Sequence, residues 1–135
     1  MRVVFDTNVL VAAFAADGLC AKLLRRANRR EFSLVLCPII LEELEQVLKK
    51  KIGATAGEIR NAIDLLAEIS TVAGKDPAPA PPARLVRDPD DDLILACAAA
   101  ARAEILVTGD KDLLAIGRHG RTRIIDPRAF ELLFS

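Results

Sequence analysis

The stretch Arg2-Val3-Val4-Phe5-Asp6-Thr7-Asn8 decides the fold of this chain, because a short apolar run ends abruptly in an acid, a hydroxyl and an amide. Valine and phenylalanine favour a buried, pleated strand, so we predict a central strand over residues 2–6 with Asp6 at its carboxyl end. In open α/β sheets, ligand sites lie at the carboxyl ends of the strands. Asp6 is therefore the first candidate functional residue.

The rest of the chain alternates between predicted helices and strands. Helices are expected at residues 8–16, 19–30, 38–50, 93–102 and 113–116, and from residues 55 and 127 onward. Strands are expected at residues 33–37, 70–73, 105–108 and 123–125, and an extended proline-rich connector at 76–82. This alternation indicates an α/β fold, a three-layer α/β/α sandwich with a central parallel sheet. Residues 1–135 are expected to form a single domain.

Several classes of protein are disfavoured by composition. No apolar run approaches the roughly twenty residues that span a bilayer, and Asp6 interrupts the stretch that a signal peptide would need. Cys20, Cys37 and Cys97 are odd in number, far apart and in apolar surroundings, so we expect buried thiols in a reducing, cytoplasmic compartment. His119 is the single histidine, which leaves a zinc site or a Ser-His-Asp triad without its usual ligands.

The charged side chains are grouped, although 19 basic and 19 acidic residues balance. The basic groups are Lys22, Arg25, Arg26, Arg29 and Arg30; Lys49 to Lys51; and Arg118, Arg121, Arg123 and Arg128. Each group alone is explained as a solvated helix face or a favourable helix-end charge. Together they permit a basic rim around an acidic centre, which suits a polyanionic substrate. Because Trp and Tyr are absent, we expect contacts mainly with a nucleic-acid backbone.

Acidic residues recur beside the later apolar segments. In the helix that starts at Pro38, periodicity places Glu43 at the border of the apolar stripe and Glu42 nearly opposite it. Glu43 is therefore the candidate functional acid, and Glu42 is predicted to point to solvent. The alternative for Glu43 is a surface acid that pairs with a lysine one turn further on.

Two further groups of aspartates follow. In the first group, Asp91 is the preferred functional acid, because it shares a helix face with apolar residues one turn further on. Asp92 is the alternative if the helix starts one residue later. Asp88 is a candidate supporting acid. Asp110 leaves its strand as Asp6 does, and it is preferred to Asp112, which helix capping explains fully. Capping alone is the alternative explanation for each of these aspartates.

Three or four carboxylates at one sheet edge raise each other's pKa and oppose folding unless a cation is bound. Carboxylates without His or Cys suit hard Mg²⁺ or Mn²⁺. Such an ion lowers the pKa of bound water and neutralises charge on a phosphoryl oxygen. The predicted chemistry is phosphodiester hydrolysis.

Four segments resemble, in order and spacing, the signature motifs of PIN domains: Val4–Leu10, Ile40–Leu44, Asp88–Asp92 and Leu106–Leu114. The chain is most similar to VapC-like toxin ribonucleases of toxin–antitoxin systems. The resemblance implies a Mg²⁺-dependent endoribonuclease acting on single-stranded RNA, a three-layer PIN-like fold, a homodimer and a small antitoxin partner. One departure is Cys37, before Pro38, where many relatives carry Ser or Thr.

The resemblance also assigns roles to residues. It implies metal-holding acids at Asp6, Glu43, Asp91 and Asp110, with Asn8 and Thr108 as polar supports. Asp6, Asp91 and Asp110 would hold one or two ions, and Glu43 would position or deprotonate the attacking water. Two alternatives remain. One is a catalytically silent PIN-like protein that binds RNA or a partner. The other is a haloacid-dehalogenase-like phosphohydrolase, which needs a second Asp where this chain has Asn8.

Overall fold

The sheet has six strands in the computed structural model, which describes residues 1–72 and 89–135. They are β1 (Arg2–Phe5), β2 (Ser33–Leu36), β3 (Ser70–Val72), β4 (Ile105–Val107), β5 (Arg118–His119) and β6 (Thr122–Ile125). Their order is β3-β2-β1-β4-β6-β5, and every pairing is parallel except that of β5 with β6. The first strand therefore lies inside the sheet, as predicted.

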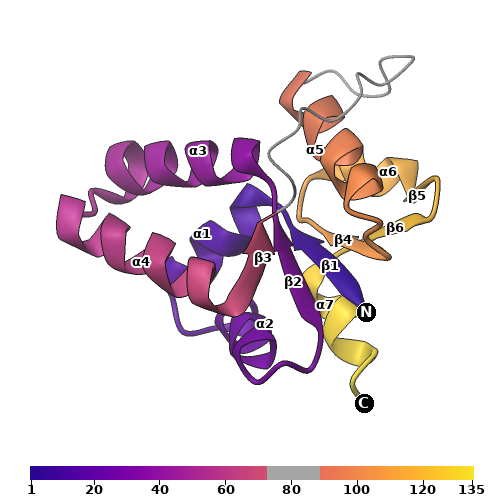
Figure 1. Cartoon of the computed structure of the whole chain (residues 1–135), viewed down its shortest axis with the longest axis horizontal. Coiled ribbons are helices and arrows are strands. Elements are labelled where there is room, and N and C mark those ends of the chain that lie inside the picture. The colour runs from indigo at the N-terminus through magenta and orange to yellow at the C-terminus, as the bar shows by residue number, and fades with distance from the viewer. Residues whose placement is uncertain (73–88) are drawn as a thin grey trace.

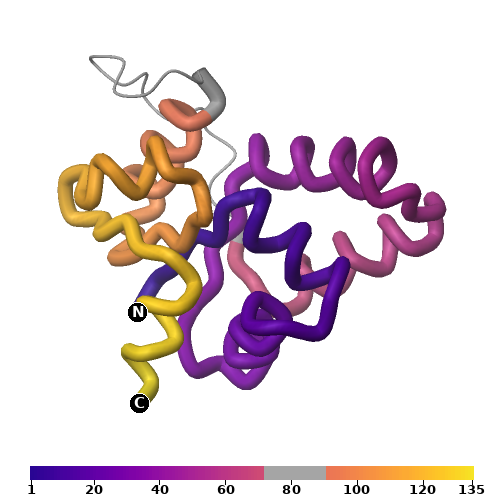
Figure 2. Tube along the Cα trace, turned by 180° about the vertical axis from the view of Figure 1, so that it is seen from behind, coloured from indigo at the N-terminus to yellow at the C-terminus, as the bar shows by residue number. Residues whose placement is uncertain are grey.

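Helices connect the strands and lie on both faces of the sheet (Figure 1). They are α1 (Thr7–Ala15), α2 (Leu19–Asn28), α3 (Pro38–Val47), α4 (Ala56–Ile69), α5 (Pro89–Ala100), α6 (Lys111–Ile116) and α7 (Pro127–Leu132), with a π-helical turn, η1 (Leu48–Ile52), after α3. Figures 1 and 2 show α3 and α4 extending to one side of the central strands and α5 and α6 lying on the other side. The predicted α/β architecture with a mostly parallel sheet is confirmed.

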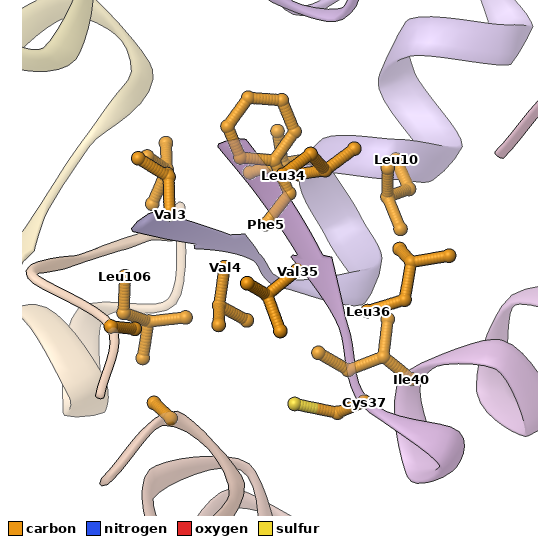
Figure 3. Close-up of a cluster of buried hydrophobic side chains, with 14 of the residues drawn as sticks. Val3, Val4, Phe5, Leu10, Leu34, Val35, Leu36, Cys37, Ile40 and Leu106 are labelled. Atoms are coloured by element: carbon orange, nitrogen blue, oxygen red, sulfur yellow. The ribbon is translucent and has the colours of Figure 1, made fainter. Parts of the chain in front are cut away.

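The core lies on both faces of the central strands, because successive strand side chains point in opposite directions. Phe5 and Leu34 project to one face, and Val4 and Leu106 project to the other (Figure 3). On the first face, Phe130 of α7 packs edge-on against Phe5 with ring centroids 6.0 Å apart. All five side chains are buried. A wholly apolar strand such as β4 is explained by this burial on both faces.

Most element boundaries agree with the sequence to within two residues, and α4 begins with a capping box. Thr55 accepts from the backbone N–H of Glu58, and Glu58 accepts from that of Thr55, at 3.1 and 3.0 Å. The start of α5 is a correction, because the helix begins at Pro89 and not at residue 93. Proline suits the first turn of a helix, and the following aspartates stabilise that turn through the helix dipole.

The C-terminal hairpin was also not predicted. No strand was expected between residues 116 and 123, but Arg118 and His119 form β5, which pairs with Arg123 and Thr122. Gly120 provides the turn with a φ of 59°. A two-residue strand is too short to produce a period-two pattern in the sequence.

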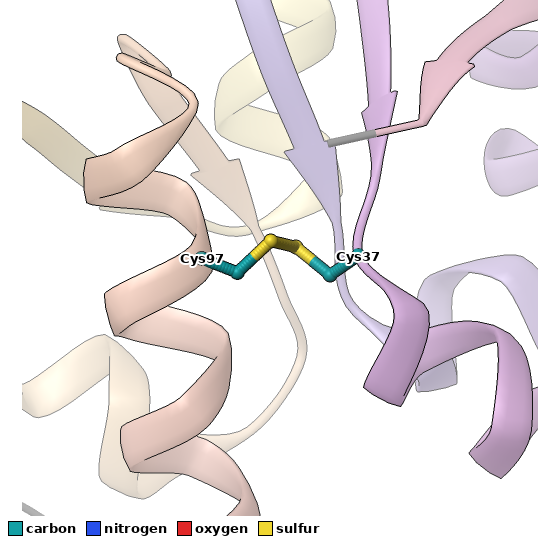
Figure 4. The surroundings of a disulfide bond; sticks show 2 residues. All are labelled: Cys37 and Cys97. Atoms are coloured by element: carbon teal, nitrogen blue, oxygen red, sulfur yellow. A yellow bond between two sulfur atoms is a disulfide. The ribbon is translucent and has the colours of Figure 1, made fainter. Parts of the chain in front are cut away.

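The prediction of three unbonded thiols is wrong for two of them. Cys37 and Cys97 are joined by a disulfide, with Cα atoms 6.1 Å apart (Figure 4). Both residues are buried, as expected, and Cys20 is free. The two cysteines are 60 positions apart, so only the parallel topology brings the end of β2 beside the middle of α5.

Two predictions lie outside the described residues, namely the proline-rich connector at 76–82 and the candidate supporting acid Asp88. In the described part of the chain, no single helix has the length and apolar character needed to cross a membrane. Helices α1 and α2 reach that length and composition only together, and they are bent by 99° relative to each other.

Candidate active site

The candidate site lies at the carboxyl edge of the three central strands. Val4 is in register with Val35 of β2, and Phe5 is in register with Val107 of β4. Two residues after Val35 is Cys37, and one residue after Val107 is Thr108, so both lie level with Asp6. By strand alternation the three side chains point to the sheet face that α5 covers.

The carboxylate of Asp6 is buried, with 4% of the residue exposed, and it accepts three hydrogen bonds. Its Oδ1 accepts from the backbone N–H of Thr7 at 2.7 Å, which caps α1. Its Oδ2 accepts from the hydroxyl of Thr108 at 2.7 Å and from Nδ2 of Asn8 at 3.2 Å. Both predicted polar supports therefore contact Asp6.

The pKa of Asp6 is raised above its ordinary value of 3.8, first by burial of the carboxyl group and further by the charge of Asp110. The hydrogen bonds from Thr108, Thr7 and Asn8 act in the opposite direction and stabilise the ionised form. Burial and the carboxylate of Asp110 therefore oppose ionisation of Asp6, whereas the three hydrogen bonds favour it. A cation at this edge would relieve the conflict.

The second acid, Asp110, is joined to the first through Thr108. The Thr108 hydroxyl accepts from the backbone N–H of Asp110 at 3.0 Å while it donates to Asp6. Asp110 also caps α6, because its Oδ1 accepts from the backbone N–H of Asp112 at 2.8 Å. The prediction that Asp112 caps this helix is therefore wrong, and Asp112 is exposed.

Glu43 and Glu42 differ in burial as helical periodicity predicts. Glu43 is half-buried and its Oε1 is shielded from solvent, whereas Glu42 is exposed. In α5, Asp91 and Asp92 are both buried, with 6% and 7% exposed. Burial supports Asp91 as an inward-facing acid, but Asp92 is buried to the same degree, so burial does not separate the two candidates.

The structure joins Asp6, Asn8, Thr108 and Asp110 through hydrogen bonds. Among residues 1–72 and 89–135, no three His, Cys, Asp or Glu side chains are grouped so that they could hold one metal ion. The pair formed by Asp6 and Asp110 does fit Mg²⁺ chemically, because this ion keeps several waters and is usually bound through one or two carboxylates. Glu43 and Asp91 lie on helices that contact each other, α3 and α5.

One polar residue at the site was missed by sequence reasoning. Thr7 is 7% exposed, and its hydroxyl oxygen is buried without a hydrogen-bond partner in the described part of the chain. A buried polar atom of this kind calls for a ligand, an ion or an ordered water. The only signal in the sequence was its position between Asp6 and Asn8.

The predicted basic rim is corrected for the group in α2. Lys22, Arg25, Arg26 and Arg29 each form an ion pair with Asp17, Glu31 or Glu131, at 2.5–3.1 Å. Arg118, Arg121, Arg123 and Arg128 are exposed, and the described residues offer them no ion pair. Arg118 and Arg123 lie directly opposite each other in the hairpin, an unfavourable arrangement of like charges.

Comparison with known proteins identifies the family. A model described as PIN domain matches residues 2–112, which include all four predicted acids. The chain belongs to the PIN domain family. No curated protein sequence matches it.

The fold of this PIN domain is also found among solved structures, of which fourteen chains match. One is a chain in the crystal structure of VapBC2 from Rickettsia felis bound to a DNA fragment from their promoter. The two chains superpose with a TM-score of 0.67 and are 17% identical, over 93% of this chain and 98% of the other. At this identity the similarity establishes the fold.

Proposed function

We propose that this PIN domain is a Mg²⁺- or Mn²⁺-dependent endoribonuclease that hydrolyses phosphodiester bonds in single-stranded RNA. The observation that carries the proposal is the unit of Asp6, Thr108 and Asp110 at the carboxyl edge of the sheet, in which one hydroxyl donates to the Asp6 carboxylate and accepts from the backbone N–H of Asp110. Two acids held this close favour a cation, and oxygen ligands without His or Cys favour a hard one. Membership of the PIN family supports the same chemistry.

Bound at this edge, Mg²⁺ would supply Lewis acidity and a water of lowered pKa. Asp6 and Asp110 would hold it, while Thr108 and Asn8 keep the Asp6 carboxylate in a fixed orientation. Glu43 would position or deprotonate the attacking water, and Asp91, with Asp92 as the alternative, would complete the acidic set. Cleavage would leave a 5′-phosphate and a 3′-hydroxyl.

The RNA backbone would be held by the exposed arginines of the β5–β6 hairpin and α7, since the basic side chains of α2 pair with acids. From the register, Asp126 is level with Asp6 two strands away, so Arg128, two residues further on, follows the carboxyl end of β6. Arg123 lies at the amino end of β6, three residues before that level, and its side chain points to the sheet face opposite to that of Asp6. The absence of Trp and Tyr favours backbone contacts over base stacking.

The biological setting that we propose is the toxin half of a toxin–antitoxin pair, in a single-domain, cytoplasmic protein that forms a homodimer. Its support is the likeness in fold to a chain of the VapBC2 complex. A short open reading frame beside this gene, and co-purification of its product with this chain, would test the partner. Size-exclusion chromatography with light scattering would test the dimer.

A silent PIN domain that binds RNA or a partner remains a second candidate, because the described acids do not form a group of three. The family match leaves the haloacid-dehalogenase-like alternative without support. The deciding experiment incubates pure protein with RNA and Mg²⁺ or Mn²⁺, sequences the cleavage ends, and compares the Asp6→Asn variant. Metal-dependent cleavage that the variant lacks supports the nuclease. Calorimetry without metal binding, together with equal RNA decay in both samples, would favour the silent protein.

A further inference from the structure

We propose that the amino edge of the sheet, where the parallel strands begin, is a second binding surface for the phosphate backbone of RNA. Figure 1 shows the N-terminus at this edge, at the start of β1. Arginines stand at the starts of three adjacent strands, with Arg30 before β2, Arg2 in β1 and Arg102 before β4. The identity of the ligand as RNA rests on the proposed nuclease function, whereas the existence of a surface for a polyanion does not.

Arg30 and Arg102 occupy the same position in two equivalent helix ends. Arg30 follows α2 and Arg102 follows α5, and each lies three positions before the first residue of the next strand. Both have a left-handed backbone, with φ of 60° and 57°. In both, the N–H of the arginine bonds to the carbonyl three residues earlier, and the next N–H bonds to the carbonyl five residues earlier. Both helices therefore end in a Schellman motif.

Glycine is the usual residue at this position, because a side chain makes a left-handed backbone costly. This chain has glycine after two other helical segments, with Gly53 after η1 at a φ of 74° and Gly117 after α6 at 72°. Among the described residues, Arg30 and Arg102 are the two other than glycine with a positive φ. Arginine at both places indicates a role for the guanidinium groups that the fold itself does not require.

The structural alternative is a favourable interaction of each positive charge with the dipole of the preceding helix. The last turn of α2 already contains Arg25 and Arg26, so Arg30 adds little to this effect. The last turn of α5 contains no basic residue, so Arg102 does contribute there. The helix dipole therefore explains one of the two arginines and not the pair.

The arginines of this edge are exposed, and the fold does not neutralise them. Arg30 belongs to the predicted basic group of α2, but unlike Arg29 it forms no ion pair in the described part of the chain. Arg2 donates from Nε to the carbonyl of Ala101 at 2.7 Å, a neutral acceptor. This bond holds the Arg2 guanidinium beside the peptide group that joins Ala101 to Arg102. Like charges held near each other repel, and a bound anion relieves that repulsion.

The β5–β6 hairpin continues the same edge. Arg121 lies in its turn, and Arg123 is level with the first residue of β4. The exposed acids of the edge that form no ion pair in the described chain are Glu104, just before β4, and Glu68, just before β3. Five arginines face these two acids, namely Arg2, Arg30, Arg102, Arg121 and Arg123. The edge therefore has an excess of positive charge, although the whole chain is neutral.

Arginine side chains in this arrangement suit a phosphate backbone. A guanidinium group binds two phosphate oxygens through parallel N–H groups. The edge from β2 to β6 crosses three strand spacings, or about 14 Å, which corresponds to about four phosphates at 3.4 Å each along a strand. Arg2 and Asp6 are separated by four residues of strand, or about 13 Å. An RNA cut at the carboxyl edge must therefore extend well beyond the cleaved bond to reach this surface, so the expected substrate is a long or folded RNA.

The test measures binding of a single-stranded RNA to the full chain in the Asp6→Asn background without metal, so that the RNA stays intact. Fluorescence anisotropy over a range of salt concentrations compares this parent with the double variant Arg30→Gly, Arg102→Gly. Glycine accepts the left-handed backbone, so the double variant should melt no lower than the parent. We expect RNA binding to weaken about tenfold and the slope of log K against log salt to fall by about 1.4, because each lost phosphate contact removes about 0.7 for a single strand.

Two further variants show whether the position and the charge matter. Changing Arg30 and Arg102 to Lys keeps both charges, so the slope should stay that of the parent. Arg60→Gln removes one charge from an exposed arginine of α4 that forms no ion pair in the described chain. This control should leave both the affinity and the slope unchanged.

Other outcomes overturn the proposal. An unchanged slope in the glycine variant, or equal losses of binding in the glycine and lysine variants, would refute the surface. A lower melting temperature with unchanged RNA binding would mean that the arginines serve only the helix ends. Tighter binding of polyglutamate than of RNA would assign the edge to an acidic protein segment, and tighter binding of DNA of the same sequence would assign it to DNA.

Failure of this surface can be distinguished from failure of the nuclease function. RNA binding that depends on Arg30 and Arg102, together with no metal-dependent cleavage by the natural chain, would refute the nuclease function and leave the surface in place. Metal-dependent cleavage by the natural chain, together with RNA binding that the glycine variant leaves unchanged, would refute the surface and leave the nuclease function in place.

Discussion

The hydroxyl of Thr108 donates a hydrogen bond of 2.7 Å to Oδ2 of Asp6, across 102 positions of the chain. Because the same hydroxyl accepts from the backbone of Asp110, one buried side chain fixes the ends of β1 and β4 and the start of α6 relative to each other. The supports of the site are therefore also part of the fold. Substitutions at this point should change stability as well as activity.

Thr108→Val should lower the free energy of unfolding by about 1–3 kcal/mol, because a buried carboxylate and a backbone N–H lose their partner. Urea unfolding of the natural chain and the variant measures the difference. Thr108→Ser keeps the hydroxyl and should recover most of the loss. Equal urea midpoints for Thr108→Val and the natural chain would show that the hydrogen bonds contribute nothing to the fold.

Thr7→Val should change the free energy of unfolding in the opposite direction and stabilise the protein. The Thr7 hydroxyl is buried without a partner in the described residues, so an apolar side chain of similar shape removes a desolvation penalty. We expect the free energy of unfolding to rise by about 1 kcal/mol. If RNA cleavage falls in the same variant, the Thr7 hydroxyl contacts a ligand during the reaction. A lower thermal midpoint for Thr7→Val would sink the interpretation of an unpartnered hydroxyl.

Glu43→Gln should reduce metal-dependent RNA cleavage about 100-fold or more, as expected for loss of a group that positions or deprotonates water. Glu42→Gln is the matched control, because it removes the same charge from the neighbouring position, which is on the exposed side of α3. We expect Glu42→Gln to stay within twofold of the natural rate. Similar losses in both variants would mean that overall charge, and not position, decides the rate.

Sequence periodicity located most elements and much of the site. It placed β1 inside the sheet, identified Asp6 and Asp110 at strand ends, and separated Glu43 from Glu42. These successes share a cause, since each depends on burial that repeats with the period of a helix or strand. Asp91 and Asp92 could not be separated in this way, because both side chains are buried.

Sequence periodicity could not predict contacts between residues that are far apart in the chain. The disulfide between Cys37 and Cys97 depends on the crossover topology, and the ion pair between Arg26 and Glu131 joins residues 105 positions apart. The basic character of α2 looked available for RNA only because its acidic partners are distant in sequence. Local composition reveals charge, but only the fold reveals which charges are already paired.

The exposed arginines lead to a prediction about salt. Changing Arg121 and Arg123 to Gln should weaken RNA binding and reduce the slope of log K against log salt by about 1.4, because each lost phosphate contact removes about 0.7 for a single strand. Binding is measured in the Asp6→Asn background, so that RNA stays intact. Arg29→Gln is the control, because Arg29 pairs with Glu31. An unchanged slope in the double variant would exclude the hairpin from RNA binding.

The last prediction concerns acid stability at the junction of α2 and α7. Arg26 contacts Glu131 through two hydrogen bonds, of 2.9 and 2.5 Å, and Lys22 lies 3.1 Å from the same carboxylate. Hydrogen bonding by Arg26, more than by Lys22, lowers the pKa of Glu131 from its ordinary value of 4.5 to about 2. A depressed folded-state pKa stabilises the protein above the unfolded-state value and loses that effect as pH falls through the folded-state value.

Glu131→Gln should therefore lower the thermal midpoint by a few degrees at pH 7, and the gap from the natural chain should close as pH falls from about 4.5 to about 2. Thermal melts followed by circular dichroism across this range measure the gap. Glu45→Gln, at an exposed acid of α3 that forms no ion pair in the described chain, is the matched control and should give no pH-dependent gap. A gap for Glu131→Gln that stays constant down to pH 2 would mean that shape and packing, and not the charge of Glu131, hold α7 against α2.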